Sequence, residues 1–387
     1  MTQDFTSEDI SEDVRFQIDE VRKRCASEFS KYPGYDTDFS IIRWLTTYNY
    51  DVDVVVQKIK LTISTYLALN LNKVSYDTVE EVNDHVKALT PLAEYFPGGL
   101  MGYDNDNNLI FVHAVARTDV TGLIACGRVS ELFRMCTTEG ELALKLVRKK
   151  ESELGKKLGI KVIVDLEGFS LDMLSSSALK VYLNLLVVLQ RIFPDFASQV
   201  FVVNCPTLLS LAYAAVKPVL ATQIRERIEF LRSDWREKLC EALGSENVYP
   251  QWGGTKLIPS KANGKPSGTI RMGGPAPDNL RYENNNITEP DSLTTVNVPA
   301  RYSETIEVNV DSPGKTLKWF FKCSSGDIDF GIKKNGSYVW PKYRLTTEFV
   351  PEYGFIDCGE EGIYELSFSN EHGKLWSKDI MYSIDVE

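Results

Sequence analysis

The sequence lacks the long apolar run that a membrane span requires. Along its 387 residues, no segment reaches the roughly 18 consecutive apolar residues typical of a transmembrane helix. The first residues, MTQDFTSEDI, have neither the basic nor the apolar region of a secretory signal. These absences predict a cytoplasmic protein.

Metal-ligand spacing is missing as well. The 7 cysteines form no CxxC pair, and the 3 histidines, His85, His113 and His372, are too far apart in the sequence for ligand-like spacing. An odd number of cysteines favours reduced thiols over a disulfide framework. We expect no metal, no cofactor, and structural or surface roles for the histidines.

Positive charge is in short supply. The 43 lysines and arginines are outnumbered by 54 aspartates and glutamates, which gives a formal net charge of -11. Neutralising the phosphates of a nucleic acid requires a clustered excess of basic side chains. We therefore expect no nucleic-acid partner.

Catalytic motifs are also absent, because the sequence contains neither GxSxG nor HExxH. The GKT tripeptide at 314–316 resembles the end of a phosphate-binding loop, but Asn309 occupies the position of its first glycine. Asp165 and Glu167 could be proposed as an acid/base pair, although the DLEG segment that holds them fits a turn at a strand end better. We expect the protein not to be an enzyme.

What the sequence does contain is an α/β pattern in its central part. Three apolar segments rich in β-branched residues predict buried strands: LIFVHAV at 109–115, IKVIVDL at 160–166 and QVFVVNC at 199–205. Long stretches of helical character separate these strands, as in α/β domains. The preceding residues, 1–75, have the pattern of several short helices.

The C-terminal part of the sequence changes character. Residues 251–300 are rich in glycine, proline and asparagine, which favours loops. Apolar side chains then alternate along short segments, as at Leu317, Trp319 and Phe321, and this alternation predicts an all-β sandwich. The expected domains are an N-terminal helical subdomain at 1–75, an α/β domain at 76–255, a linker at 256–275 and a β-sandwich at 276–387.

Three segments of the α/β region resemble the CRAL-TRIO lipid-binding domain. They are VIVDLEGFSL at 162–171, FPDFASQVFVVNCPTLLSLAYAAVKPVL at 193–220 and VYPQWGGT at 248–255. In the C-terminal region, KTLKWFFKCSSGDIDFGI at 315–332 resembles part of a GOLD domain. The chain is thus similar to the CRAL-TRIO plus GOLD lipid-transfer proteins, a family that includes supernatant protein factor and the tocopherol-associated proteins.

The resemblance implies a hydrophobic cavity that is floored by the sheet and closed by a mobile helix. The side chains expected to line the cavity are Phe111, Val162, Val164, Phe169, Tyr182, Phe201 and Val203. The gate helix is expected at about 215–231, where apolar side chains at helical spacing can form a stripe that faces the cavity. The residues predicted for the gate helix are Val216, Val219, Leu220, Ile224, Arg227, Ile228 and Leu231.

The resemblance further implies a single hydrophobic ligand, similar to tocopherol, squalene, a sterol or a phospholipid. The protein would transfer or present this ligand between membranes, with which it would associate transiently. Family members that bind phosphoinositides use several basic residues, and only Arg227 has a clear counterpart here. Arg43 is followed by Thr46, Thr47 and Tyr48 where those members carry further bases. An apolar ligand is therefore favoured.

Two other functions stay open at this point. The first is an adaptor that acts on membranes or proteins through its GOLD domain and has no transfer activity. Copurified lipid would favour the carrier, whereas a collapsed cavity would favour the adaptor. The second is an unrecognised hydrolase, which would need a polar cluster around Asp165, Glu167 and a histidine. In the carrier as in the adaptor, the GOLD domain could bind a protein partner.

Overall fold

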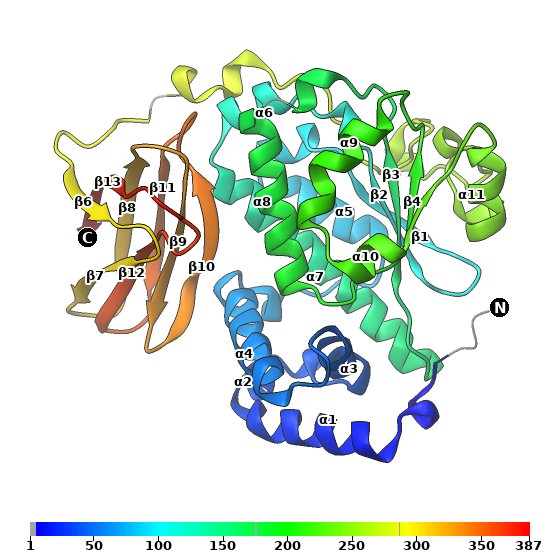
Figure 1. Cartoon of the computed structure of the whole chain (residues 1–387), viewed down its shortest axis with the longest axis horizontal. Helices are drawn as coiled ribbons and strands as arrows, with labels where there is room; N and C mark the ends of the chain where they lie inside the picture. Colours follow the sequence, from blue (N-terminus) through cyan, green and yellow to red (C-terminus); the bar gives the residue numbers. More distant parts are fainter. Residues whose placement is uncertain (1–4, 175, 286) are drawn as a thin grey trace. The chain divides into compact units, whose positions relative to one another are not determined.

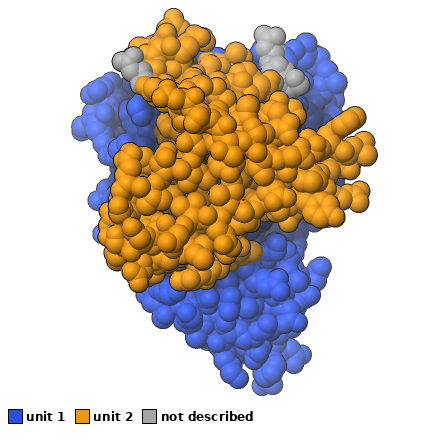
Figure 2. All heavy atoms as spheres, turned by 90° about the vertical axis from the view of Figure 1, so that its left-hand side faces the viewer, with its two compact units in different colours: residues 1–60, 71–120, 135–275 blue, residues 61–70, 121–134, 276–387 orange. Residues whose placement is uncertain are grey.

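The computed structural model describes residues 5–174, 176–285 and 287–387. The chain divides into two compact units, which are coloured separately in Figure 2. The first comprises Met1–Lys60, Leu71–Val120 and Met135–Pro275, and the second comprises Leu61–Asn70, Thr121–Arg134 and Ala276–Glu387. N-terminal helices and an α/β sheet are followed by a β-sandwich, so the predicted multidomain fold class is confirmed.

Among the residues from 5 onward that the structure describes, five α-helices precede the sheet in the sequence. They are α1 (Glu12–Arg24), α2 (Ala26–Lys31), α3 (Asp38–Thr47), α4 (Val52–Ala68) and α5 (Val79–Ala88). Several of them begin at side-chain caps, including α3 and α5. The hydroxyl of Thr37 accepts a hydrogen bond from the backbone N–H of Ser40 at 3.1 Å, and Thr78 forms a capping box with Glu81. The indole of Trp44 is fully buried and anchors α3 in the first unit.

A five-stranded sheet forms the centre of the first unit. Its strands are β1 (Gly99–Tyr103), β2 (Leu109–His113), β3 (Ile160–Asp165), β4 (Ala197–Val203) and β5 (Ile228–Phe230). They lie in that order, with β1 antiparallel to β2 and every other neighbouring pair parallel. The runs of β-branched residues in β3 and β4 suit central parallel strands, which are covered on both faces.

Helices cover both faces of this sheet (Figure 1). On one face lies α11 (Trp235–Leu243), and on the other lie α8 (Ser176–Ile192), α9 (Leu209–Val216) and α10 (Thr222–Glu226). Two further helices, α6 (Val120–Cys126) and α7 (Val129–Leu154), precede β3 in the sequence. Within the described ranges, no helix has the length and apolar character needed to cross a bilayer.

The segment 256–275, which the composition indicated as a linker, packs into the first unit. Ile270 is buried in the core beside the sheet. The guanidinium of Arg271 forms a buried ion pair with Glu139 at 2.9 Å, and its backbone pairs with Gly98 in an antiparallel bridge. A buried charge is tolerated only when it is paired in this way, so these contacts fix the segment. Whether the predicted domain ranges fold independently remains a prediction for fragment expression.

Two four-stranded antiparallel sheets form the sandwich of the second unit. One has the order β10 (Ser337–Thr346), β9 (Asp327–Lys334), β12 (Gly362–Ser369), β7 (Ser303–Val310). The other has the order β11 (Glu352–Cys358), β8 (Lys315–Cys323), β13 (Lys378–Val386), β6 (Thr294–Val298). The rings of Phe321, Phe330 and Phe368 meet between the sheets, with centroids 4.8 to 5.2 Å apart. The predicted C-terminal β-sandwich is confirmed.

Candidate functional site

The central strands of the five-stranded sheet present two faces that are packed to different degrees. On one face, Ile110, Ile163 and Phe201 are almost completely buried. On the opposite face, Phe111 and Val162, which lie side by side on β2 and β3, both keep accessible surface. Alternate residues of a strand point to opposite faces, so the difference in burial separates the two sides of the same strands.

The tightly packed face is sealed by α11 and by the segment that follows it. Trp235 and Leu239 of α11 are buried against it, together with Tyr249 and Trp252. The indole N–H of Trp252 donates a 3.0 Å hydrogen bond to the carboxylate of Asp165 at the end of β3. This face has the packing of an ordinary protein interior.

The carboxylates of the DLEG turn have structural roles in this geometry. Besides Trp252, Asp165 accepts hydrogen bonds from the side-chain amide of Asn204 at 2.8 Å and from the backbone N–H of Glu167 at 2.9 Å. The carboxylate of Glu167 pairs with Arg117 instead. Among the described residues, no cluster of histidine, cysteine and acidic side chains could hold a metal ion.

The less tightly packed face gathers apolar side chains from three strands and from α10. Ala197, Val200 and Val202 of β4 form a small buried cluster. The partly buried apolar residues packed against this cluster are Val162, Val164, Leu166, Phe196, Cys205, Ile224 and Ile228. Two predicted cavity residues, Val162 and Val164, therefore share this face with two predicted gate residues, Ile224 and Ile228.

His113 extends the same face beyond Phe111 on β2. Its Nδ1 donates a hydrogen bond to the carbonyl oxygen of Pro97 at 3.0 Å, and its ring contacts those of Phe96 and Tyr182, with centroids 5.4 and 5.9 Å away. Burial lowers the pKa of the imidazole to about 4. The side chain nevertheless keeps accessible surface. The imidazole of His113 is therefore shielded from water strongly enough to shift its pKa, although its neighbours do not cover it completely.

The structure does not bring all of the predicted cavity residues together. Phe201 and Val203 point to the tightly packed face, opposite Val162 and Val164, because neighbouring residues in register share a face and Phe201 pairs with Ile163. They pack against α11 as ordinary core residues. Two other predicted residues remain compatible with the less tightly packed face: Tyr182 through its contact with His113, and Phe169, which is partly exposed in the loop after β3.

The predicted gate helix at 215–231 requires a correction. The structure divides this segment into the end of α9, a 3-10 turn at Lys217–Val219, the short helix α10 and the strand β5. Pro218 has no backbone N–H and cannot continue α9. Ile228 is a strand residue that pairs with Val200, and Leu231 is buried on the opposite face of the sheet. The predicted stripe therefore does not lie on one helix.

Helix α9 is the most apolar part of this segment, yet none of its residues is buried. Its sequence is LSLAYAAV, and Leu211 leaves 51% of its surface exposed. One aromatic contact connects it to the edge of the sheet, where the ring of Tyr213 meets Phe230 edge-on at 5.2 Å. An apolar helix whose residues all keep accessible surface marks an interaction site more often than a structural one.

Gln190 connects α8 to the turn between α9 and α10. Its amide nitrogen donates to the carbonyl oxygen of Val219 at 3.0 Å, and its amide oxygen accepts from the backbone N–H of Ala221 at 2.7 Å. The two bonds hold a segment in which neither the 3-10 turn at Lys217–Val219 nor α10 has a buried residue. We call this pair of bonds the Gln190 clasp.

Two arginines considered as headgroup ligands are engaged in ion pairs. Arg43 is buried, with its guanidinium 2.5 Å from Glu151. Arg227 contacts Asp195 at 2.6 Å and donates to the carbonyl oxygen of Ala197 at 2.6 Å. Burial alone would raise the pKa of Asp195, but its cationic neighbours outweigh burial and lower it. Both arginines therefore have partners within the protein.

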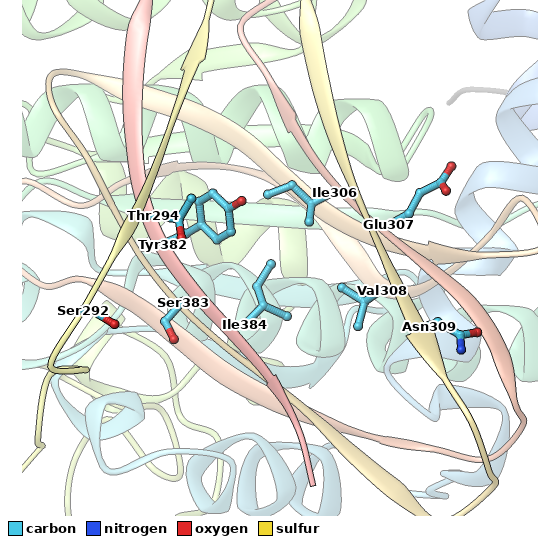
Figure 3. A pocket seen from close by; sticks show the side chains of 9 residues that line it. All are labelled: Ser292, Thr294, Ile306, Glu307, Val308, Asn309, Tyr382, Ser383 and Ile384. Carbon is cyan, nitrogen blue, oxygen red and sulfur yellow. The ribbon is translucent and has the colours of Figure 1, made fainter.

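The β-sandwich has a separate hollow of about 430 Å³ between the edge strands of its two sheets (Figure 3). The side chains of Ile306, Val308, Tyr382 and Ile384 point toward one another there, whereas Glu307 points away. None of the predicted cavity residues lines this hollow.

The sequence interpretation missed three features of the site. Val200 and Val202 line the less tightly packed face, and the alternation along β4 could have separated them from Phe201 and Val203. His113 was assigned no part in the cavity although it follows Phe111 by two residues. The predominantly apolar character of α9 was visible in the sequence, but only the structure shows that none of its residues is fully buried.

Comparison with known proteins places the site in a recognised domain. Residues 93–254 match the model of the CRAL/TRIO domain. Protein ctg-1 of Caenorhabditis elegans is 25% identical over 371 residues, which cover 90% of this chain and 91% of that protein. The CRAL-TRIO domain-containing protein F28H7.8 of the same species is 23% identical and covers 93% of this chain and 85% of its own length. The crystal structure of Sfh5 matches with a TM-score of 0.44 at 16% identity, covering 60% of this chain and 84% of that one.

Proposed function

We propose that this chain, which is a CRAL/TRIO domain protein with a C-terminal β-sandwich, encloses one hydrophobic lipid-like molecule and transfers or presents it between membranes. The CRAL/TRIO domain is a lipid-binding domain, and its match spans all five strands of the α/β sheet. The ligand would lie on the less tightly packed face of β2, β3 and β4. The activity requires no covalent chemistry.

The observation that carries this proposal is the unequal packing of the two faces. Ile163 on one face is completely buried, whereas its neighbours Val162 and Val164 on the other face keep accessible surface. Central strands of an α/β sheet are normally buried on both faces. Apolar side chains that are enclosed by helices but incompletely covered are suited to contact an apolar guest.

The polar groups near this face indicate what kind of ligand it would accept. Burial keeps His113 neutral at physiological pH, and its Nδ1 proton is already donated to Pro97. The paired states of Arg43 and Arg227 leave neither guanidinium free to neutralise a phosphate. An isoprenoid, tocopherol-like, squalene-like or sterol-like molecule therefore fits better than a phosphoinositide.

Helix α9 and the turn that follows it are proposed to form the gate. An apolar helix that lacks buried residues can leave the sheet at low energetic cost and can place its apolar side chains in the headgroup region of a bilayer. The Gln190 clasp would hold the closed state. The residues proposed for this gate are Val216, Val219, Leu220 and Ile224 from the original prediction, with Leu211 and Tyr213 added.

An enclosed site is useful because a lipid that leaves a membrane without a carrier must expose its apolar chain to water. Moving a chain of 18 methylenes through water costs roughly 14 kcal/mol, at about 0.8 kcal/mol for each group. An apolar cavity removes most of that barrier. The sandwich, which we propose to be of the GOLD type, would direct the protein to a membrane or to a protein partner.

The proposal can be tested by filling the site. Val164→Phe should lower the amount of lipid bound by the purified protein and slow transfer between labelled vesicles, while Val164→Ala should leave both nearly unchanged. In a fully packed interior, the larger side chain would instead lower the free energy of unfolding by about 1–3 kcal/mol. A destabilised Val164→Phe variant with unaltered lipid content would contradict the carrier and favour the adaptor.

A further inference from the structure

One end of the β-sandwich carries three exposed side chains with large apolar surfaces, which we call the docking tip. Tyr302 precedes β7, and Leu375 and Trp376 lie in the loop between β12 and β13. Their exposed fractions are 66%, 81% and 79%. Side chains of this size normally bury most of their surface, so three of them on adjoining loops require an explanation.

The two loops are held together from inside by Asn370, which is itself buried. Its backbone N–H donates to the carbonyl oxygen of Tyr302, and its carbonyl oxygen accepts from the N–H of Arg301, both at 2.9 Å. Its side-chain amide donates to the carbonyl oxygen of Trp376 at 3.0 Å. At Gly373 an added Cβ would come within 2.3 Å of the Asn370 amide oxygen, so the turn is tight. The backbone is thus fixed while the tip side chains remain exposed.

Trp376 differs from every other tryptophan in the chain. The sequence contains 6 tryptophans, and the others are at most 5% exposed. An indole with an apolar ring and a polar N–H is well suited to the boundary between lipid headgroups and acyl chains, where tryptophan and tyrosine are enriched.

Two basic side chains flank the docking tip, in a protein whose overall charge is negative. Arg301 and Lys374, which flank the tip residues in the sequence, are exposed, and the formal net charge of the protein is -11. The nearby carboxylate of Glu371 lies 3.5 Å from the ammonium group of Lys342, which also contacts Asp329 at 3.7 Å. Basic side chains beside exposed aromatic ones match an anionic lipid surface.

We infer that the docking tip inserts into the headgroup region of bilayers that contain anionic lipid. A stable protein interface requires about 800 Å² from each partner, which three side chains do not supply. A bilayer, by contrast, accepts an isolated protrusion and gains free energy from each apolar group that enters it. This inference deepens the membrane role proposed for the sandwich, but it does not depend on a ligand in the α/β domain.

Trp376 is a natural probe for the test, because it is the tryptophan that solvent reaches. Vesicles of phosphatidylcholine with phosphatidylserine, added to the full-length protein, should shift its emission to shorter wavelength and reduce quenching by acrylamide. Brominated lipids in the same vesicles should quench the emission. Vesicles of phosphatidylcholine alone should produce a much smaller change.

Variants distinguish insertion from other ways of binding. Leu375→Ala combined with Trp376→Ala should weaken sedimentation with anionic vesicles by about tenfold or more, because both side chains lose their apolar contact with the bilayer. Arg301→Glu combined with Lys374→Glu should weaken it by a similar factor, and only when phosphatidylserine is present. The matched control is Leu257→Ala, which removes an even more exposed leucine from the first unit and should change nothing.

The outcomes separate this inference from the proposed carrier function. Lipid bound by the purified protein and its far-ultraviolet circular dichroism should be the same in all of these variants, because the residues of the proposed lipid site belong to the first unit and the tip residues to the second. Unaltered vesicle binding by the Leu375/Trp376 variant would overturn the inference. So would tip-dependent self-association in sedimentation equilibrium without any fluorescence response to vesicles.

Discussion

The imidazole of His113 stacks on the ring of Tyr182, with the ring centroids 5.9 Å apart and the planes 14° from parallel. The contact joins β2 to α8 across the less tightly packed face of the sheet. Burial lowers the pKa of His113 to about 4, from 6.5 for an exposed histidine. The pKa of His113 therefore measures how far water is excluded from this face in the folded protein.

His113 should make the protein less stable as the pH falls from about 6.5 to 4. In this window the unfolded chain binds a proton that the folded protein excludes, so the free energy of unfolding decreases with decreasing pH. Between pH 7 and pH 5, His113→Gln should lose about 2 kcal/mol less than the wild type in urea unfolding. Parallel curves for the two proteins would show that the imidazole is accessible to protons when folded.

Leu211 is the position at which the proposed gate is tested with the least disturbance of the fold. Because its side chain is largely exposed, Leu211→Glu should leave the free energy of unfolding within about 0.5 kcal/mol of the wild type. Transfer to anionic vesicles should slow by about tenfold, since a charge replaces an apolar contact with the bilayer. Leu154→Glu, at a comparably exposed leucine near the end of α7, is the control. Equal transfer rates for all three proteins would remove α9 from the mechanism.

The Gln190 clasp should restrain opening of the gate. Gln190→Ala removes two hydrogen bonds to the backbone of 219–221, and a loss of about 1 kcal/mol from the closed state corresponds to roughly fivefold more frequent opening. Lipid exchange measured with fluorescent ligand should accelerate accordingly. Gln190→Glu keeps the acceptor for Ala221 but not the donor for Val219, so it should give an intermediate rate. An exchange rate indifferent to both changes would contradict the clasp.

Arg43 is expected to act in folding and not in headgroup binding. Its guanidinium bonds to Glu151 and to the carbonyl oxygen of Leu158 at 2.6 Å. Arg43→Met leaves a buried carboxylate unpaired and should lower the free energy of unfolding by about 3–5 kcal/mol, most of which Glu151→Leu should restore in the double variant. A stable Arg43→Met protein with weakened affinity for phosphoinositide vesicles would reverse this assignment.

The strands were predictable because their signal is local. Valine and isoleucine in IKVIVD and VFVV favour extended backbone, and in the sandwich the alternation through Leu317, Trp319 and Phe321 separates inward from outward side chains. The order of the segments in the resemblance to the CRAL-TRIO domain supplied the remaining organisation. Strand preference and alternation depend only on residues close together in the sequence, so they can be recognised without knowing how the rest of the chain folds.

The details of the site were less accessible because they depend on packing over long sequence distances. The sequence interpretation assigned Phe201 of β4 to the cavity, whereas Val200 lies on the less tightly packed face and Phe201 on the opposite one. Which face of β4 is which depends on where α11 packs. The local sequence of 215–231 favours a helix, which is why the gate helix was predicted there. Its last part instead pairs with β4 through Ile228, and tertiary pairing here outweighs local helical preference.

The central claim is that a single lipid-like molecule occupies the α/β domain, and native mass spectrometry of the purified full-length protein tests it most directly. We predict a population heavier than the bare chain by the mass of one lipid, which organic extraction recovers as an apolar molecule and which the Val164→Phe variant largely lacks. A protein that carries only its own mass, and that acquires none after incubation with vesicles containing tocopherol, squalene, sterol or phospholipid, would contradict the account.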